Sequence, residues 1–176
     1  MSDTQIVESL REKIFETIER TQHLVSLASA QRLDWQPETV NARAFLDLGH
    51  LMGHLLECLS GFCAVFYAAF PEKLRHLSDL RSLQVNHCCS AEEANQRIQE
   101  YARQIAQAFD VCKDSDLARV LPTVFDPGGE AVATLLLGNL EHLINHKYQL
   151  FFYLKMQGMP VGTRDLYHWR GPGQDA

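Results

Sequence analysis

Apolar residues recur every three or four positions in four long stretches of the chain, the spacing expected for one face of an α-helix. The first stretch runs from residue 4 to about residue 31 and places Ile6, Leu10 and Ile14 between charged positions. The other three stretches are 42–70, 91–113 and 130–157. The pattern therefore predicts four long amphipathic helices.

Capping and breaking residues separate these stretches. Pro37 interrupts the chain after the first stretch, and Asn41 is suited to cap the second, which Pro71 ends. Ser90 and Glu93 stand at the spacing of a reciprocal capping pair, which predicts the start of the third helix.

The fourth stretch is bounded by turn signals on both sides. The run Asp126-Pro127-Gly128-Gly129 precedes it, and Gly158 with Pro160 follows it in the usual helix-stop order. Just upstream, segment 120–125 can form only a short extended piece, because Pro122 excludes it from the centre of a sheet.

Four such helices without alternating strands predict an all-α fold, a four-helix bundle. We expect one domain over residues 1–170 and a disordered C-terminal end over 171–176. The connections between helices 2 and 3 and between helices 3 and 4 are long for a simple bundle. Either could cross an end of the bundle or form part of a pocket.

A polar stripe lies on the last and most apolar helix. Residues placed 100° apart bring His142, His146, Gln149 and Tyr153 onto one narrow face, well away from the charged positions of that helix. Polar groups that face a core need partners, which can be hydrogen bonds or a bound ligand.

Two histidine pairs share the spacing that puts imidazoles on adjacent turns, where both can reach one metal ion. They are His142 with His146 on the last helix and His50 with His54 on the second. When a chain has one such histidine pair, the two residues are more often hydrogen-bonded or surface histidines. The presence of a second pair favours a metal site. His54 lies nearer the core stripe of its helix, and His50 is the alternative. That stripe consists of Leu48, Leu51, Leu55, Leu59, Phe62 and Phe66.

Two neighbours of His54 have competing interpretations. Cys58 could be a further ligand, but buried cysteine is common as a small apolar residue, so we expect it to pack. Glu57 could support a ligand from behind, or be an ordinary exposed acid, which we favour. Three neutral imidazoles would leave positions open for water or substrate, as catalytic metal sites do.

The chain resembles the DinB-like (DinB/YfiT) family of metal-dependent enzymes. The resemblance rests on Leu33-Asp34-Trp35-Gln36-Pro37, on Leu51-Met52-Gly53-His54-Leu55-Leu56-Glu57 and on His142-Leu143-Ile144-Asn145-His146-Lys147-Tyr148-Gln149, followed by Tyr153-Leu154 and Gly158. It implies a four-helix bundle, often a homodimer. One histidine of helix 2 and two of helix 4, here His54, His142 and His146, would bind a divalent metal ion, with His50 as the alternative ligand.

The resemblance also implies a chemistry. Relatives of known activity are transferases and isomerases that use low-molecular-weight thiols such as bacillithiol or mycothiol, and many others have no assigned substrate. The metal would activate a thiol or water for a small-molecule substrate. Gln149 and Tyr153 could bind that substrate or serve structurally. Imidazole ligands suit zinc, nickel, iron or copper alike, and no residue is singled out as catalytic.

Composition excludes some alternatives and leaves others. With 16 basic against 22 acidic side chains in 176 residues, the net charge of −6 argues against nucleic acid as a ligand. No signal peptide is evident, and the longest charge-free apolar stretch, Cys58–Pro71, is too short to span a membrane. Five cysteines, an odd number, favour a reducing cytoplasm.

Two other functions fit the same residues. A non-catalytic helical-bundle dimer would use its apolar surface, including Phe62, Phe66, Phe151 and Phe152, to bind a ligand or partner. A histidine cluster could alternatively sense pH.

Overall fold

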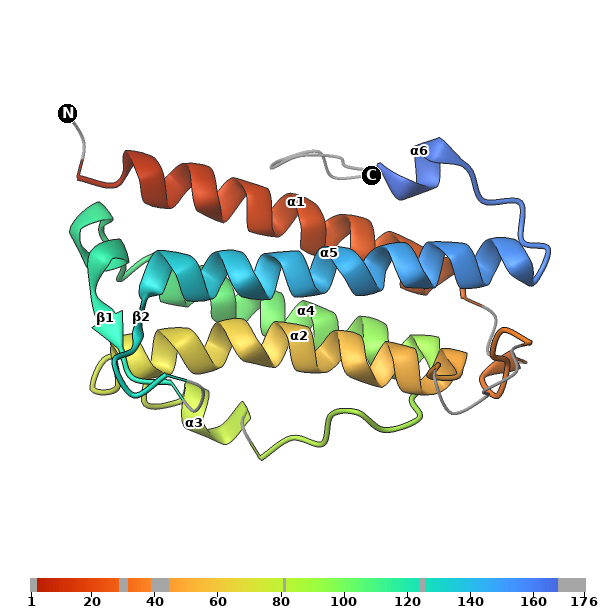
Figure 1. The fold of residues 1–176 in the computed structure, drawn as a ribbon, viewed down its shortest axis with the longest axis horizontal. Coiled ribbons are helices and arrows are strands. Elements are labelled where there is room, and N and C mark those ends of the chain that lie inside the picture. Colours follow the sequence, from red (N-terminus) through yellow and green to blue (C-terminus); the bar gives the residue numbers. More distant parts are fainter. Residues whose placement is uncertain (1–2, 29–31, 39–44, 81, 124–125, 168–176) are drawn as a thin grey trace.

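Four long helices form the body of the protein, and they confirm the predicted all-α four-helix bundle. In the computed structural model, which describes residues 3–28, 32–38, 45–80, 82–123 and 126–167, they are α1 (Gln5–Leu27), α2 (Leu48–Ala69), α4 (Ala91–Phe109) and α5 (Val132–Met156) (Figure 1). The expected caps and ends at Asn41 and 171–176 lie outside the described residues.

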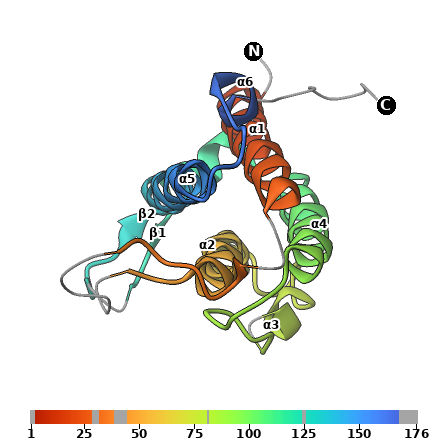
Figure 2. The same ribbon diagram turned by 90° about the vertical axis from the view of Figure 1, so that its right-hand side faces the viewer.

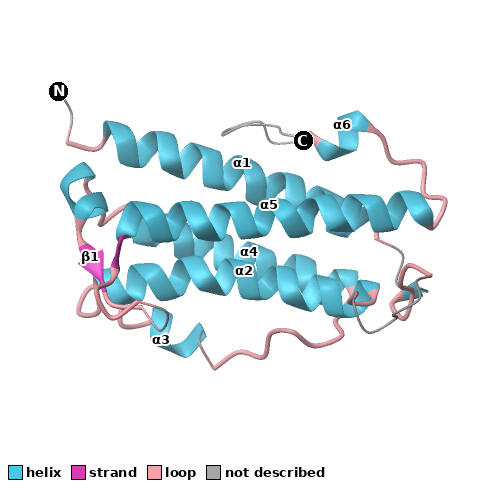
Figure 3. Ribbon diagram, viewed as in Figure 1, coloured by secondary structure: helices cyan, strands magenta, loops and turns pink. Residues whose placement is uncertain are grey.

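Short elements occupy the connections (Figure 3). Helix α3 (Leu77–Leu80) lies between α2 and α4, and α6 (Thr163–Leu166) follows α5. The connection from α4 to α5 holds a 3₁₀ helix, η3 (Asp114–Ala118), and two antiparallel strands. These strands are β1 (Val120–Leu121) and β2 (Glu130–Ala131). As Figure 1 shows, this connection crosses one end of the bundle.

Viewed along their axes, the long helices follow the order α1, α4, α2, α5 around a common core (Figure 2). The predicted stripe of α2 is that core: Leu51, Leu55, Leu59, Phe62 and Phe66 are each 0% exposed. By length and composition α2 could cross a membrane, but 61% of its most apolar window is buried inside the bundle, as in the core helix of a soluble protein. The packing of α2 against α5 brings the two histidine-bearing helices together.

Helix α2 begins six residues later than the predicted start at residue 42. The Asp47 side chain accepts a hydrogen bond from the backbone N–H of His50 at 2.8 Å and caps the helix. The N–H groups of Leu48 and Gly49, at the start of the helix, donate to the carbonyls of Trp35 and Leu33, which replace the acceptors that an earlier helical turn would supply.

The other predicted boundaries were also too generous. Helix α1 ends at Leu27, where Ala28 becomes extended. Helix α4 ends at Phe109, short of Lys113, and the Asp114 carboxylate beyond it accepts from the N–H groups of Ile6 and Val7 at the start of α1. After α4, Asp110 also pairs with Arg11 of α1 at 2.8 Å, a tertiary contact that periodicity alone does not predict.

The start of α4 and the turn before α5 were predicted more accurately, because short sequence motifs mark them. Ser90 caps α4 by accepting from the Glu93 N–H at 3.1 Å, as predicted. The reciprocal half of the predicted pair is replaced, because the Glu93 carboxylate accepts from His87 at 2.7 Å. The predicted turn before α5 forms with Gly129 at a φ of 79°, and residues 120–121 pair with the two residues that precede α5. That pairing explains why α5 starts at Val132 and not at residue 130.

Candidate metal centre

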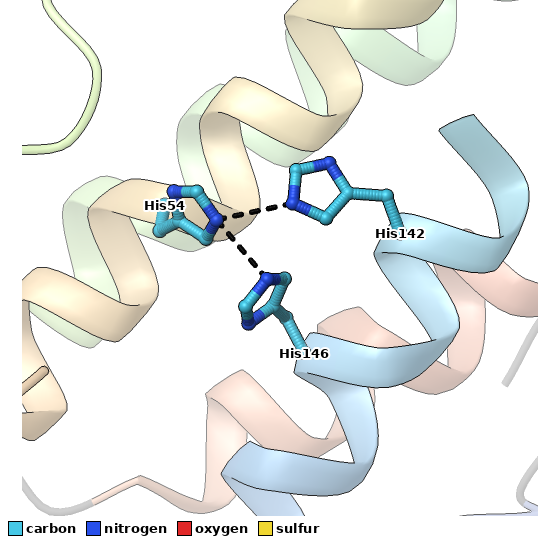
Figure 4. Close-up of side chains that lie close together, drawn as sticks. All are labelled: His54, His142 and His146. Carbon is cyan, nitrogen blue, oxygen red and sulfur yellow. Dashed lines mark hydrogen bonds between the residues drawn. The ribbon is translucent and has the colours of Figure 1, made fainter. Parts of the chain in front are cut away.

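Three imidazoles from two neighbouring helices converge on one point (Figure 4). The Nε2 atom of His54 on α2 lies 3.1 Å from Nε2 of His142 and 3.1 Å from Nε2 of His146, both on α5. The four-residue spacing puts the two α5 rings on successive turns, with centroids 4.8 Å apart. The group has the composition and spacing to hold a metal ion.

His50 lies outside this group. Its Nδ1 is 2.8 Å and 2.9 Å from the two carboxylate oxygens of Asp47, the cap of α2, and its side chain is 44% exposed. Of the two α2 histidines, the structure therefore brings His54 to the α5 pair and leaves His50 one turn away, beside its own acidic partner.

The hydrogen bonds of His54 define which of its nitrogens carries a proton. Its Nδ1 lies 2.6 Å from Asn86 Oδ1 and 2.9 Å from Glu57 Oε2. A carboxylate can only accept, so Nδ1 must be the protonated nitrogen. The same contact fixes the Asn86 amide with its oxygen toward the ring. Nε2 of His54 then carries a lone pair directed at the other two histidines.

A second chain of hydrogen bonds fixes His146 in the same way. The Tyr153 hydroxyl donates to the carbonyl of Leu46 at 2.9 Å and accepts from Gln149 Nε2 at 3.0 Å. This arrangement turns Gln149 Oε1 toward His146 Nδ1, at 2.9 Å. An amide oxygen only accepts, so His146 also carries its proton on Nδ1 and its lone pair on Nε2.

The result is a contact that uncharged rings cannot satisfy. Nε2 of His54 and Nε2 of His146 both present lone pairs, and His142 can supply an N–H to only one of them. Burial is the main cause that lowers the pKa of His142 and of His146, which favours neutral rings. A positive charge between the three nitrogens, a proton or a metal ion, would relieve the contact.

The spacing also suits a metal. Four-coordinate zinc with Zn–N bonds of about 2.05 Å separates its nitrogen ligands by about 3.3 Å, close to the two 3.1 Å separations. All three side chains are partly exposed, so the group lies at the edge of the core and not inside it.

Gln149 and Tyr153 therefore have defined partners. Their hydrogen bonds run from Leu46 to His146, and Tyr153 is only 3% exposed. Contact with a substrate stays a prediction for both. Glu57 is both a support and an exposed acid: its side chain is 43% exposed, and its carboxylate lies 2.9 Å from Nδ1 of His54.

Asn86 is a residue of the site that the sequence pattern did not predict. It lies 32 residues from His54 in the connection between α3 and α4, where no periodic pattern marks it. Cys58, considered as a further ligand, is 1% exposed in the core, and burial raises the pKa of its thiol to about 12. A protonated thiol in that position packs as an apolar group.

We expect the Tyr153→Phe variant to bind zinc about tenfold more weakly than the wild type, the lower end of what lost support behind a metal-ligating histidine costs. Without the hydroxyl, the Gln149 amide is free to rotate and no longer dictates the His146 tautomer. Competition with a chromophoric chelator measures the affinity.

Tyr148→Phe is the matched control. Its hydroxyl also lies on α5 but pairs with Tyr167 at 2.9 Å, away from the histidines. Equal affinity losses in the two variants would show that the effect is not specific to the chain of hydrogen bonds behind His146.

Comparison with known proteins agrees with this fold. The structure is similar to the crystal structure of a DinB-like protein, YjoA, from Bacillus subtilis, with a TM-score of 0.62 and 17% sequence identity over 85% of this chain and 92% of that one. No family model and no curated protein sequence matches the chain. The chain therefore has the DinB-like fold that its motifs predicted.

Proposed function

We propose that this DinB-like bundle binds one divalent metal ion through His54, His142 and His146. The observation that carries the proposal is the 3.1 Å distance between Nε2 of His54 and Nε2 of His146. Acceptors at Nδ1 of each ring leave both of these Nε2 atoms unprotonated. When bound by neutral imidazoles, such an ion acts as a Lewis acid that deprotonates a coordinated thiol or water.

We further propose that the protein is a transferase that uses a low-molecular-weight thiol. Three protein ligands leave room for an exogenous one. Four of the five thiols of the chain are buried and poor nucleophiles, since burial raises the pKa of Cys58, Cys63 and Cys89 to about 12 and that of Cys112 to about 11. The thiolate would come from a small molecule, which the partly exposed position of the three histidines favours.

The test is turnover of thiol and electrophile by metal-loaded protein. Glutathione, bacillithiol and mycothiol would each be offered with 1-chloro-2,4-dinitrobenzene after loading with zinc, nickel or iron(II). We expect metal-dependent conjugation with at least one thiol, reduced about 100-fold or more in His146→Ala, because the variant loses a ligand that fixes the reacting group.

His50→Ala is the matched control and should keep the activity, because His50 pairs with Asp47 outside the triad. If no thiol reacts faster than in buffer under any metal, the transferase proposal fails and the non-catalytic bundle is favoured. If His50→Ala loses activity and His54→Ala does not, the ligand assignment is wrong.

One observation supports the association of two copies of the chain, as in the non-catalytic dimer considered above. Leu137, Phe152 and Met156 are 53%, 57% and 61% exposed on one face of α5, whereas Phe62, Phe66 and Phe151 are buried in the core. Exposed apolar groups on a shared face are typical of an interface. We propose a homodimer, which a monomer mass in sedimentation at micromolar concentration would contradict.

We also propose that the protein works in the cytoplasm. All five cysteines are free thiols. Cys88 and Cys89 are adjacent in the chain but lie in different environments, since Cys88 is exposed and Cys89 is buried. Free thiols are typical of a reducing compartment.

A further inference from the structure

The connection between α3 and α4 runs along α2 (Figure 1), and its residues 85–89, which we call the strap, are hydrogen-bonded to that helix. The N–H of Asn86 donates to the Gly53 carbonyl at 3.1 Å, and the N–H of Cys89 donates to the Gly49 carbonyl at 3.2 Å. The two glycines stand one helical turn apart, and a Cβ on Gly53 would overlap the His87 carbonyl oxygen. The strap can lie this close only because α2 has no side chain there.

Asn86 holds a special backbone conformation in the strap. Its φ of 58° is in the left-handed region, the only positive φ outside glycine among the described residues. Asparagine tolerates this region better than most residues. The conformation lets one residue make two contacts, with its N–H on Gly53 and its side-chain oxygen 2.6 Å from His54 Nδ1.

We propose that Asn86 is a positioning residue for the metal ligand His54. Its amide oxygen accepts the Nδ1 proton of His54 and so keeps the Nε2 lone pair directed at His142 and His146. This inference rests on the proposed metal-binding function. The strap becomes part of the metal centre, so the connection between α3 and α4 controls how well α2 presents its ligand.

Asn86 and Glu57 differ as supports for the same ring. Glu57 is on α2 itself, is 43% exposed and is the longer contact at 2.9 Å. Asn86 makes the shorter contact, and its backbone is fixed to α2 by a hydrogen bond one turn from Glu57. Neither residue is buried and both have a fixed backbone, Glu57 within α2 and Asn86 through its hydrogen bond to Gly53. The asparagine side chain has one rotatable bond fewer than glutamate, so holding it against the ring costs less conformational entropy.

Two substitutions separate the side chain of Asn86 from its backbone. Asn86→Gly removes the amide and accepts the positive φ without strain. Asn86→Asp restores an acceptor at the same place and also tolerates this conformation. We expect zinc affinity to fall about tenfold in Asn86→Gly and to return to within about twofold of the wild type in Asn86→Asp.

A second readout needs no metal. Nitrogen-15 NMR of the histidine rings in the metal-free wild type should show His54 protonated on Nδ1. In Asn86→Gly, where Glu57 remains as the second acceptor, we expect a partial loss of the Nδ1 form and a detectable share of rings protonated on Nε2. Asn86→Asp should again show the Nδ1 form. This measurement distinguishes the two proposals, because a protein that binds no metal would still report the tautomer of His54.

The outcomes are decisive in both directions. Wild-type zinc affinity together with an unchanged His54 tautomer in Asn86→Gly would overturn the proposal. An Asn86→Asp variant as weak as Asn86→Gly would also overturn it, since the acceptor would then be irrelevant. Weak binding and mixed tautomers in the glycine variant alone support it.

Discussion

The His146→Ala variant is expected to bind zinc roughly 100-fold or more weakly than the wild type. Structural zinc sites release about 10–16 kcal/mol over four ligands, or about 3 kcal/mol per ligand, and each 1.4 kcal/mol is about a factor of ten. His146 is also the ligand held from behind by Gln149, so its loss removes a ring whose orientation is already fixed. His142→Ala should behave alike.

The measurement uses protein purified without a histidine tag, stripped with a chelator and dialysed against zinc. We expect one zinc per wild-type chain and a melting temperature that rises with zinc concentration, because the ion binds the folded state. An exposed histidine provides the control, His76→Ala, which should match the wild type. Less than stoichiometric zinc in the wild type, or unchanged binding in both ligand variants, would sink the metal-binding proposal.

The same substitution at two helical glycines should have opposite effects on stability. A Cβ at Gly53 would overlap the His87 carbonyl oxygen and lie 2.8 Å from the His87 nitrogen, whereas a Cβ at Gly138 would meet nothing within 4 Å. Overpacking typically costs about 1–3 kcal/mol, and replacing glycine by alanine inside a helix gains about 1 kcal/mol. The obstacle at Gly53 is backbone, which cannot rotate away.

We therefore expect Gly53→Ala to lower the free energy of unfolding by about 2 kcal/mol and Gly138→Ala to raise it by about 1 kcal/mol. Urea unfolding of the metal-free protein gives both values without a contribution from zinc. Gly53→Ala should also weaken zinc binding, since it moves the strap that carries Asn86. Equal free energies of unfolding in the two variants would contradict this prediction, because the strap could then move away from a Cβ at Gly53 without loss of stability.

Much of the bundle could be predicted from local pattern. The four apolar stretches, the cap at Ser90, the turn at residues 126–129 and the core stripe of α2 all depend on contacts within a few residues of one another. Helix boundaries were less accurate at the start of α2 and at the end of α4, where residues far along the chain make contact: Trp35 and Leu33 accept from the first N–H groups of α2, and Arg11 pairs with Asp110 after α4.

The candidate site divides in the same way. The sequence presents two histidine pairs with identical spacing, and one helical turn changes the direction of a side chain by only about 40°. Periodicity alone therefore favoured His54 without excluding His50. The choice is decided by the start of α2 at Leu48, which leaves His50 beside the capping Asp47, and by the register of α2 against α5.

By itself, then, the sequence determined which helices form, which face of each is apolar and which residues of α5 share a polar stripe. Those properties follow from the fixed geometry of a helix. Only the tertiary structure decided that three imidazoles meet at their Nε2 atoms, that Asn86 and Tyr153 stand behind two of them, and that the strap crosses α2 at two glycines. Such contacts join residues far apart in the chain, and no local periodicity records them.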